Sequence, residues 1–175
     1  MPVFIIMGVC GSGKSTIGTN LAKNLSCSFL DADDFHPQSN LNKMVKGVPL
    51  NDDDRKPWLI TLNEVLISHT QSSNTNVVLG CSALKISYRA SLSKNLSSMV
   101  FIHLQGTFDT IISRLNARVG HYMKPSMLQS QFAALELPPA PEVQLMTKNK
   151  TWLTLNIDEM SVEECTLQIE RWWSK

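Results

Sequence analysis

A glycine-rich segment near the start of the chain carries the clearest chemical pattern. Residues 8–15 read Gly-Val-Cys-Gly-Ser-Gly-Lys-Ser and match the spacing GxxxxGK[ST] in full. Glycines let a backbone curl around phosphate, and the N–H groups of such a turn and of the following helix favour a bound anion. The motif predicts that Lys14 reaches the β- and γ-phosphates and that the Ser15 hydroxyl binds Mg²⁺. The predicted nucleotide site comprises Gly8, Val9, Cys10, Gly11, Ser12, Gly13, Lys14, Ser15 and Thr16.

The remaining sequence indicates which nucleotide chemistry this loop serves. A switch GTPase would need the patterns DxxG and NKxD. The first does not occur in this sequence, and residues 149–152, Asn-Lys-Thr-Trp, fail the second at the last position. A small-molecule or nucleotide kinase is therefore favoured, with a metal, an orienting group for the acceptor hydroxyl and mobile arginines.

Acidic residues follow the second predicted strand. Residues 31–37 read Asp-Ala-Asp-Asp-Phe-His-Pro. Carboxylates at the carboxyl end of a parallel strand point into the crevice where ligands bind. One of Asp31 and Asp33 can therefore contribute to the Mg²⁺ shell while the other contacts the acceptor hydroxyl. We assign Asp31 to the metal and Asp33 to the acceptor. The spacing alone leaves the reverse assignment open. Asp34 fits better as a turn or helix-cap residue.

Short apolar runs alternate with amphipathic segments along the chain, which predicts an α/β fold with one parallel five-stranded sheet covered by helices on both faces. The predicted strands are Val3–Met7, Ser28–Leu30, Val77–Leu79, Met99–Leu104 and Trp152–Ile157. Ser161 and Glu164 form a capping box before the last predicted helix. Gly120 and Pro125 interrupt the helical pattern, so we expect a lid at about residues 118–126 within a single domain, 1–175.

Composition narrows the function classes. The 175 residues include 16 Lys and Arg against 15 Asp and Glu, for a net charge of +1, which argues against bulk binding to nucleic acid or anionic lipid. No apolar run approaches the ~20 residues of a membrane span. Four dispersed cysteines fit free thiols in a reducing compartment, so we expect a cytoplasmic protein without membrane or nucleic-acid partners.

Further segments fit one family pattern together with the phosphate loop. They are residues 31–37, 40, 43–44, 47, 49–50, 52–59, 81–85, 88–89, 120–123, 130–132 and 135–136. This set is similar to the motifs of the gluconokinase family, and the resemblance runs from the phosphate loop to about Glu142.

The resemblance implies an ATP-dependent kinase that phosphorylates D-gluconate at its 6-hydroxyl to give 6-phosphogluconate. It also implies a fold like those of shikimate kinase and the nucleoside monophosphate kinases, with Mg²⁺ as cofactor and a homodimer as assembly. The substrate-binding segment would span about residues 31–60.

Gluconate has one carboxylate and a row of hydroxyls, so the gluconate site that the resemblance implies needs hydrogen-bond donors near the acidic residues. The candidates are His36, Arg55, Lys85 and Arg89, with Arg suited to a bidentate grip on carboxylate. Arg55 can instead pair with the acidic residues 52–54, which occupy the first turn of a helix.

Analogy with related kinases supplies three further candidates. Arg114 and Arg118 lie one helical turn apart, so Arg114 can stack on adenine while Arg118 enters from the lid to meet the transferred phosphoryl group. His121 lies in the same lid and contacts substrate or shapes the loop. A solvated basic helix face is the alternative for the two arginines.

Two other functions stay open from sequence. One is a kinase for another small anionic acceptor such as shikimate. The other is a nucleotide-binding protein without catalysis, against which the intact Lys14, Ser15, Asp31 and Asp33 argue.

We predict that Lys14→Met lowers turnover by ~10²–10³-fold while the fold stays intact, because Lys14 stabilises charge on the transferring phosphoryl group. Steady-state ADP release and circular dichroism measure the two properties. A folded variant with near-wild-type turnover would contradict the assignment of the phosphate loop.

Overall fold

The sheet contains five parallel strands in the order β2-β3-β1-β4-β5. The computed structural model describes residues 1–72, 75–117, 125–138, 140, 142, 146 and 148–174. In that part of the chain the strands are β1 (Val3–Met7), β2 (Ser28–Asp31), β3 (Val77–Gly80), β4 (Met99–Gln105) and β5 (Trp152–Asn156). The predicted parallel five-stranded sheet is confirmed, and the strand ends differ from the prediction by one residue at most.

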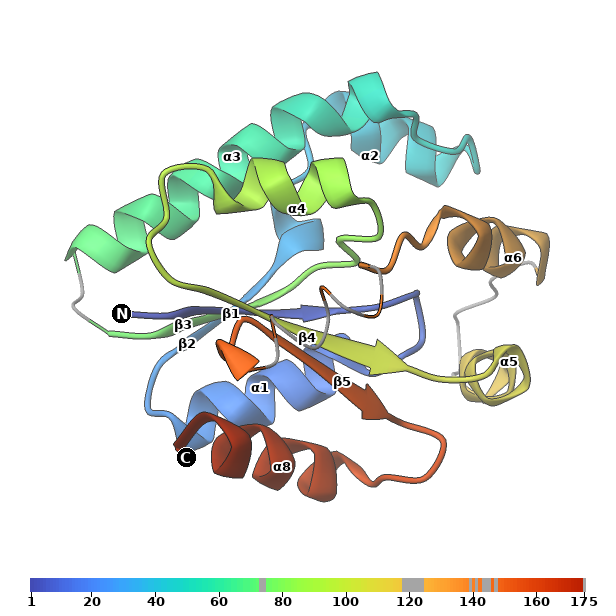
Figure 1. The fold of residues 1–175 in the computed structure, drawn as a ribbon. Coiled ribbons are helices and arrows are strands. Elements are labelled where there is room, and N and C mark those ends of the chain that lie inside the picture. Colours follow the sequence, from blue (N-terminus) through green and yellow to red (C-terminus); the bar gives the residue numbers. More distant parts are fainter. Residues whose placement is uncertain are drawn as a thin grey trace.

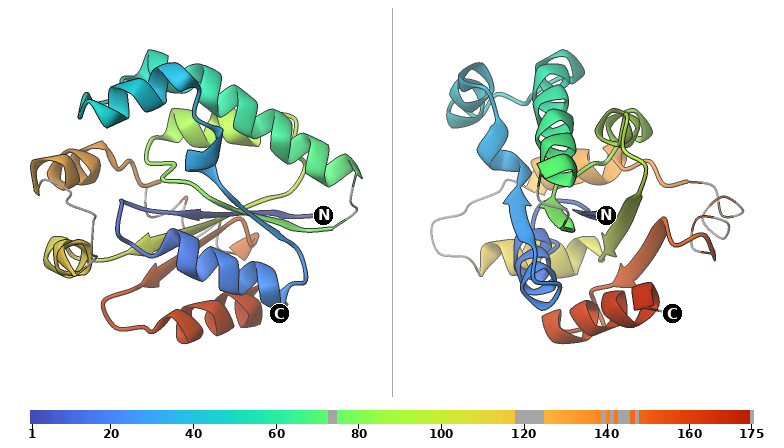
Figure 2. Two further views of the ribbon diagram at one scale, coloured as in Figure 1. Left: turned by 180° about the vertical axis from the view of Figure 1, so that it is seen from behind. Right: turned by 90° about the vertical axis from the view of Figure 1, so that its left-hand side faces the viewer.

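Helices form a layer on each face of the sheet (Figure 1). Helices α1 (Lys14–Asn24) and α8 (Val162–Ser174) cover one face, and α3 (Asp52–Ser72) and α4 (Ile86–Ser93) cover the other. Helix α2 (Gln38–Val45) follows the short 3₁₀ helix η1 (Ala32–Phe35). Helices α5 (Phe108–Asn116) and α6 (Pro125–Ala134) lie at the end of the sheet toward which the strand arrows point (Figure 2). Pro125 is the first residue of α6.

Strand β1 is apolar throughout because both of its faces are buried. Phe4 and Ile6 pack with residues of α1 and α8, whereas Val3, Ile5 and Met7 pack with residues of α3 and α4. A strand in the middle of a sheet with helices on both sides has no solvent-facing side. The strand ends at Met7, and the phosphate loop begins at the next residue, Gly8.

Two reciprocal caps set the starts of the long helices. Ser161 N–H donates to Glu164 Oε2 at 2.7 Å and Glu164 N–H donates to Ser161 Oγ at 3.2 Å, which confirms the predicted capping box of α8. At α3, Asp54 N–H donates to Asn51 Oδ1 at 2.8 Å and Asn51 N–H donates to Asp54 Oδ2 at 3.0 Å. The second cap, which we did not predict from the sequence, fixes the orientation of the acidic first turn of α3.

Helix α1 lies unusually close to β2 at Gly18. A Cβ atom at this position would sit 2.4 Å from Cε2 of Phe29 on β2. The absence of a side chain therefore lets α1, which starts at the phosphate loop, pack against the strand that ends at Asp31.

We predict that Gly18→Val lowers the free energy of unfolding by about 2 kcal/mol, because the added methyl groups overpack the contact between α1 and Phe29. Thr19→Val, at an exposed neighbouring position of α1, is the matched control and should change stability by less than about 0.5 kcal/mol. Urea unfolding followed by circular dichroism compares the two variants. Equal stabilities would show that α1 can move away from β2 without cost.

Candidate active site

The phosphate loop leaves β1 in a backbone conformation that suits glycine. The φ angles of Gly8, Gly11 and Gly13 are 144°, 85° and 98°. At Gly11 a Cβ atom would also lie 2.7 Å from Cγ of Leu115. Helix α1 begins at the next residue after Gly13, and no side chain caps it. Its first N–H groups are therefore available to an anion.

Lys14 is held inside this loop. Its ammonium group donates to the carbonyl oxygen of Val9 at 3.0 Å. Burial lowers the pKa of Lys14, while the carboxylates of Asp33 and Asp31 oppose this shift. A phosphate bound in the loop would add negative charge beside the ammonium group and favour its protonated form.

Asp31 joins the phosphate loop to the end of β2. Its Oδ2 accepts a hydrogen bond from Ser15 Oγ at 2.8 Å, and its Oδ1 accepts one from Asp33 N–H at 3.1 Å. Asp31 thus caps η1 and holds the Ser15 hydroxyl at the same time. A hydroxyl and a carboxylate side by side are hard oxygen ligands, which fits the Mg²⁺ expected here.

Asp33 projects from η1 into solvent, and 79% of its side chain is exposed. Partial desolvation raises the pKa of Asp33, the charge of Asp31 adds to this rise, and His36 and Lys14 oppose it. Because most of the carboxylate is exposed, water reaches it and opposes this rise in its pKa. Asp33 therefore combines exposure with the ability to accept a proton.

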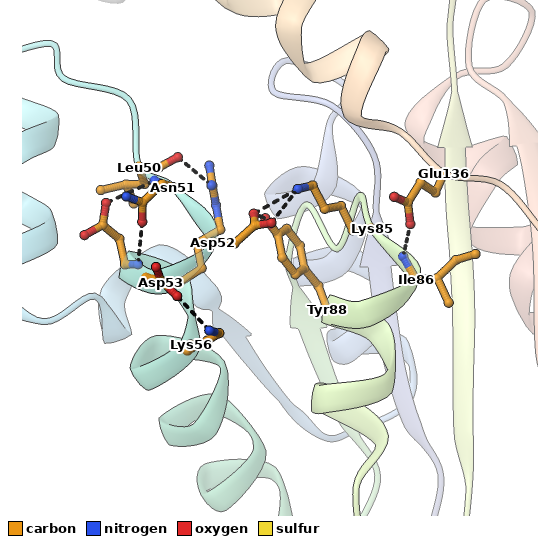
Figure 3. Close-up of polar contacts among 11 residues, drawn as sticks. Leu50, Asn51, Asp52, Asp53, Lys56, Lys85, Ile86, Tyr88 and Glu136 are labelled. Atoms are coloured by element: carbon orange, nitrogen blue, oxygen red, sulfur yellow. Dashed lines mark hydrogen bonds and ion pairs between the residues drawn. The ribbon is translucent and has the colours of Figure 1, made fainter.

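The starts of α3 and α4 meet through a cluster of polar side chains (Figure 3). Asp52 accepts hydrogen bonds from Lys85 Nζ at 2.9 and 2.8 Å and from the Tyr88 hydroxyl. The hydrogen bonds from Lys85 and Tyr88 lower the pKa of Asp52. Arg55 lies beside this cluster, with its guanidinium 5.8 Å from the Tyr88 ring centroid and Nη1 donating to the Leu50 carbonyl oxygen at 2.6 Å. Two of the predicted donors, Arg55 and Lys85, thus flank one tyrosine.

Arg89 lies apart from these donors, inside the protein. It is 6% exposed, and its guanidinium donates to the carbonyl oxygens of Ala83, Leu84 and Glu136 at 2.8, 3.1 and 2.6 Å. We therefore remove Arg89 from the predicted substrate contacts. Its bonds shape the loop that follows β3, in which Ala83 has a φ of 46°, and this loop leads directly to Lys85.

Arg114 reaches the turn between β5 and α8. Its Nη2 donates to the carbonyl oxygen of Ile157 at 2.7 Å, which places the guanidinium near the far end of β5. Residues 118–124 of the predicted lid, which include Arg118 and His121, lie outside the described residues. Their proposed roles stay predictions.

Two side chains that hold backbone segments of the site in place were not predicted from the sequence. Gln131 Oε1, on α6, accepts a hydrogen bond from Cys10 N–H in the phosphate loop at 2.7 Å. Glu136 Oε2 accepts one from Ile86 N–H at the start of α4, also at 2.7 Å. Both residues belong to segments that resemble the gluconokinase motifs, but the resemblance by itself assigned them no role.

Two findings concern the described residues as a whole. No group of three or more His, Cys, Asp and Glu side chains within them could hold a metal ion by itself. Magnesium in kinases usually keeps several waters and substrate oxygens, so a site of few protein ligands is the form expected. None of the helices in the described ranges is both long and apolar enough to cross a membrane.

Comparison with known proteins agrees with this geometry. The shikimate kinase family model matches residues 10–159. The thermoresistant gluconokinase of Escherichia coli (strain K12) is 44% identical over 144 residues, which cover 82% of each chain. A gluconokinase from Sinorhizobium meliloti 1021 has 32% identity and a TM-score of 0.82, covering 99% of this chain and 91% of that one. A sugar kinase from Janibacter sp. HTCC2649 has 33% identity and a TM-score of 0.86, covering 99% and 95%.

The fold and the phosphate loop thus define a kinase of the P-loop class, which confirms the predicted fold. The chain belongs to the family described by the shikimate kinase model and to the gluconokinase family.

We predict that Gln131→Leu weakens ATP binding about tenfold, because the Cys10 amide loses its acceptor and the phosphate loop loses its tie to α6. Gln129→Leu is the matched control, since Gln129 lies on the same helix and is exposed. Titration with a fluorescent ATP analogue measures both affinities. Equal weakening in the two variants would trace the effect to α6 in general and not to the Gln131 contact.

Proposed function

We propose that this chain is a gluconokinase that transfers the γ-phosphoryl group of ATP to the 6-hydroxyl of D-gluconate. The observation that carries the proposal is the joining of a phosphate-binding loop to an acceptor-facing carboxylate: Ser15 bonds Asp31, and Asp31 bonds the backbone of Asp33. The relatives named gluconokinase supply the acceptor, since 44% identity extends over most of the chain.

The phosphate side of the reaction rests on Lys14. When ATP enters, its β- and γ-phosphates replace the Val9 carbonyl as partner of the ammonium group. The N–H groups at the start of α1 add fixed donors that need no reorganisation as charge develops. Arg118, from the predicted lid, is proposed to add positive charge to the transferred group.

Ser15 and Asp31 would hold Mg²⁺. When bound, the ion neutralises phosphate charge during transfer. The hydrogen bond between Ser15 and Asp31 brings both oxygens to one place in advance.

Asp33 is the residue proposed to contact the acceptor hydroxyl. Because both oxygens of Asp31 are already engaged, one of them with Ser15, Asp33 is the carboxylate that suits the hydroxyl of the acceptor. An ionised Asp33 orients the 6-hydroxyl and takes its proton as the oxygen bonds to phosphorus. Of the two assignments that spacing alone left open, the proposal adopts Asp31 for the metal and Asp33 for the acceptor.

The donors around Tyr88 suit the rest of a polyhydroxy acid. Arg55 and Lys85 flank its ring at 5.8 and 5.5 Å from the centroid and carry the positive charge that a carboxylate needs. His121 is a further proposed contact from the lid. Arg114, beside the turn after β5, is proposed to stack on adenine. A homodimer in the cytoplasm stays a prediction.

We predict that ADP release depends on gluconate and stays at background with shikimate. A coupled assay with both acceptors, run with Mg²⁺ and ATP, distinguishes the two kinase activities. Turnover with shikimate alone would contradict the proposed acceptor, and gluconate-independent turnover would indicate an ATPase.

We also predict that Asp33→Asn lowers kcat at least about a hundredfold and leaves ATP affinity nearly unchanged, because an amide cannot accept the proton. Asp34→Asn, at the exposed neighbouring position, is the control. If Asp33→Asn keeps wild-type kcat, the acceptor role passes to Asp31.

A further inference from the structure

A buried asparagine on α2 connects the start of α3 to the ring of His36. Asn40 is 1% exposed, and its Nδ2 donates to the carbonyl oxygen of Asp54 at 2.9 Å. The same Nδ2 lies 3.3 Å from His36 Nδ1. Asp54 is held in turn by its cap with Asn51 and by an ion pair with Lys43 at 2.7 Å. Asn40 is thus anchored to a rigid part of the structure.

These contacts determine which nitrogen of His36 carries the proton. A carbonyl oxygen only accepts hydrogen bonds, so the Asn40 atom that faces Asp54 must be the NH₂ group. That group can only donate to His36 Nδ1, which must therefore be the unprotonated nitrogen. In the neutral ring the proton then sits on Nε2.

The plane of the ring is fixed as well. His36 stacks on Trp58 with ring centroids 4.3 Å apart and an interplanar angle of 15°. Trp58 is itself tied to the backbone of η1, because its Nε1 donates to the Ala32 carbonyl oxygen at 2.8 Å. Burial lowers the pKa of His36, Asp33 opposes this shift and Arg55 adds to it, so the surroundings favour the neutral ring.

The protonated nitrogen faces the acceptor carboxylate. His36 Nε2 lies 3.8 Å from Asp33 Oδ1, while only 5% of the His36 side chain is exposed against 79% for Asp33. This separation is longer than a hydrogen bond, but such contacts often shorten when the substrate binds. A nitrogen held in place by its ring contacts thus lies 3.8 Å from one oxygen of an exposed carboxylate.

We propose that His36 and Asn40 are positioning residues that orient Asp33: Asn40 holds the Nε2–H tautomer of His36, and this N–H holds Oδ1 of Asp33. The inference rests on the proposed function, in which Asp33 receives the acceptor proton. The second oxygen, Oδ2, is then left to take that proton as the hydroxyl oxygen bonds to phosphorus and the bond from phosphorus to ADP breaks. His36 acts through Asp33 in this arrangement, so its earlier assignment as a substrate contact is replaced.

Two substitutions of His36 separate the N–H donor from the ring. His36→Phe keeps a ring that can stack on Trp58 but removes the donor, and kcat should fall about tenfold while the KM for gluconate changes little. His36→Gln carries an amide N–H₂ in place of Nε2–H and should restore most of kcat. Loss of kcat in both variants, or in neither, would overturn the proposal. A rise confined to the KM for gluconate would make His36 a direct substrate contact instead.

Asn40 has a matched control on its own helix. Asn40→Leu removes the donor to Nδ1 and should lower kcat about tenfold, with ATP affinity unchanged. Asn42→Leu changes the same residue type at an exposed position, where its Oδ1 accepts from Gln38, and should leave kcat at the wild-type value. Thermal melts establish that each variant is folded. If Asn40→Leu does not fold, the variants His36→Phe and His36→Gln test the proposal without it.

The tautomer has a readout that needs no activity. In ¹⁵N-labelled protein, long-range correlation spectra distinguish protonated from unprotonated ring nitrogens, and His36→Gln identifies the His36 signals among the four histidines. We expect the Nε2–H form in the wild type and in Asn42→Leu, and a mixture of forms in Asn40→Leu. An Nδ1–H ring in the wild type overturns the proposal. If gluconate is not phosphorylated at all, the proposed function fails while the tautomer result stands by itself.

Discussion

The position of β1 controls the rest of the molecule. This strand lies in the middle of the sheet, and its side chains are buried alternately against α1 with α8 and against α3 with α4. A strand buried on both faces can offer only its end to solvent. The loop that leaves this end keeps the N–H groups at the start of α1 without a side-chain cap, and they lie beside the carboxyl ends of the neighbouring strands. The phosphate site therefore lies where the chain passes from the central strand to the first turn of α1.

The acceptor side depends on a different constraint, the start of α3. The cap between Asn51 and Asp54 fixes the first turn, from which Asp52 reaches Lys85 and Tyr88 and the Asp54 carbonyl reaches Asn40. One helix start thus holds α2 through Asn40 and α4 through Lys85 and Tyr88, and Figure 3 shows the contact with Lys85 and Tyr88. Such groups cost little further ordering when substrate binds, because their rotamers are already restricted.

Charged and polar residues near the site divide into those that brace the fold and those that can meet a ligand. Arg89 donates hydrogen bonds to three backbone carbonyl groups, and Gln131 and Glu136 each accept one from a backbone N–H group. Buried polar groups need such partners, since an unpaired one costs about 1–3 kcal/mol. Asp33 and Lys85 keep greater exposure, at 79% and 30% of the side chain. Burial thus separates Arg89, which is 6% exposed and bonded to backbone carbonyls, from Asp33, whose carboxylate is open to solvent.

The sequence by itself determined the strands, the helix order, the phosphate loop and the carboxylates after β2, because each has a local signal: a glycine spacing, an apolar period or a position after a strand. Tertiary structure alone decided that Arg89 is buried while Lys85, four residues earlier, reaches Asp52. It alone brought Gln131 to Cys10 across 121 residues and set the proton of His36 through Asn40 and Asp54. The physical reason is that sequence spacing fixes which residues share an element. Which donors and acceptors are already satisfied depends on backbone groups that folding brings from distant parts of the chain.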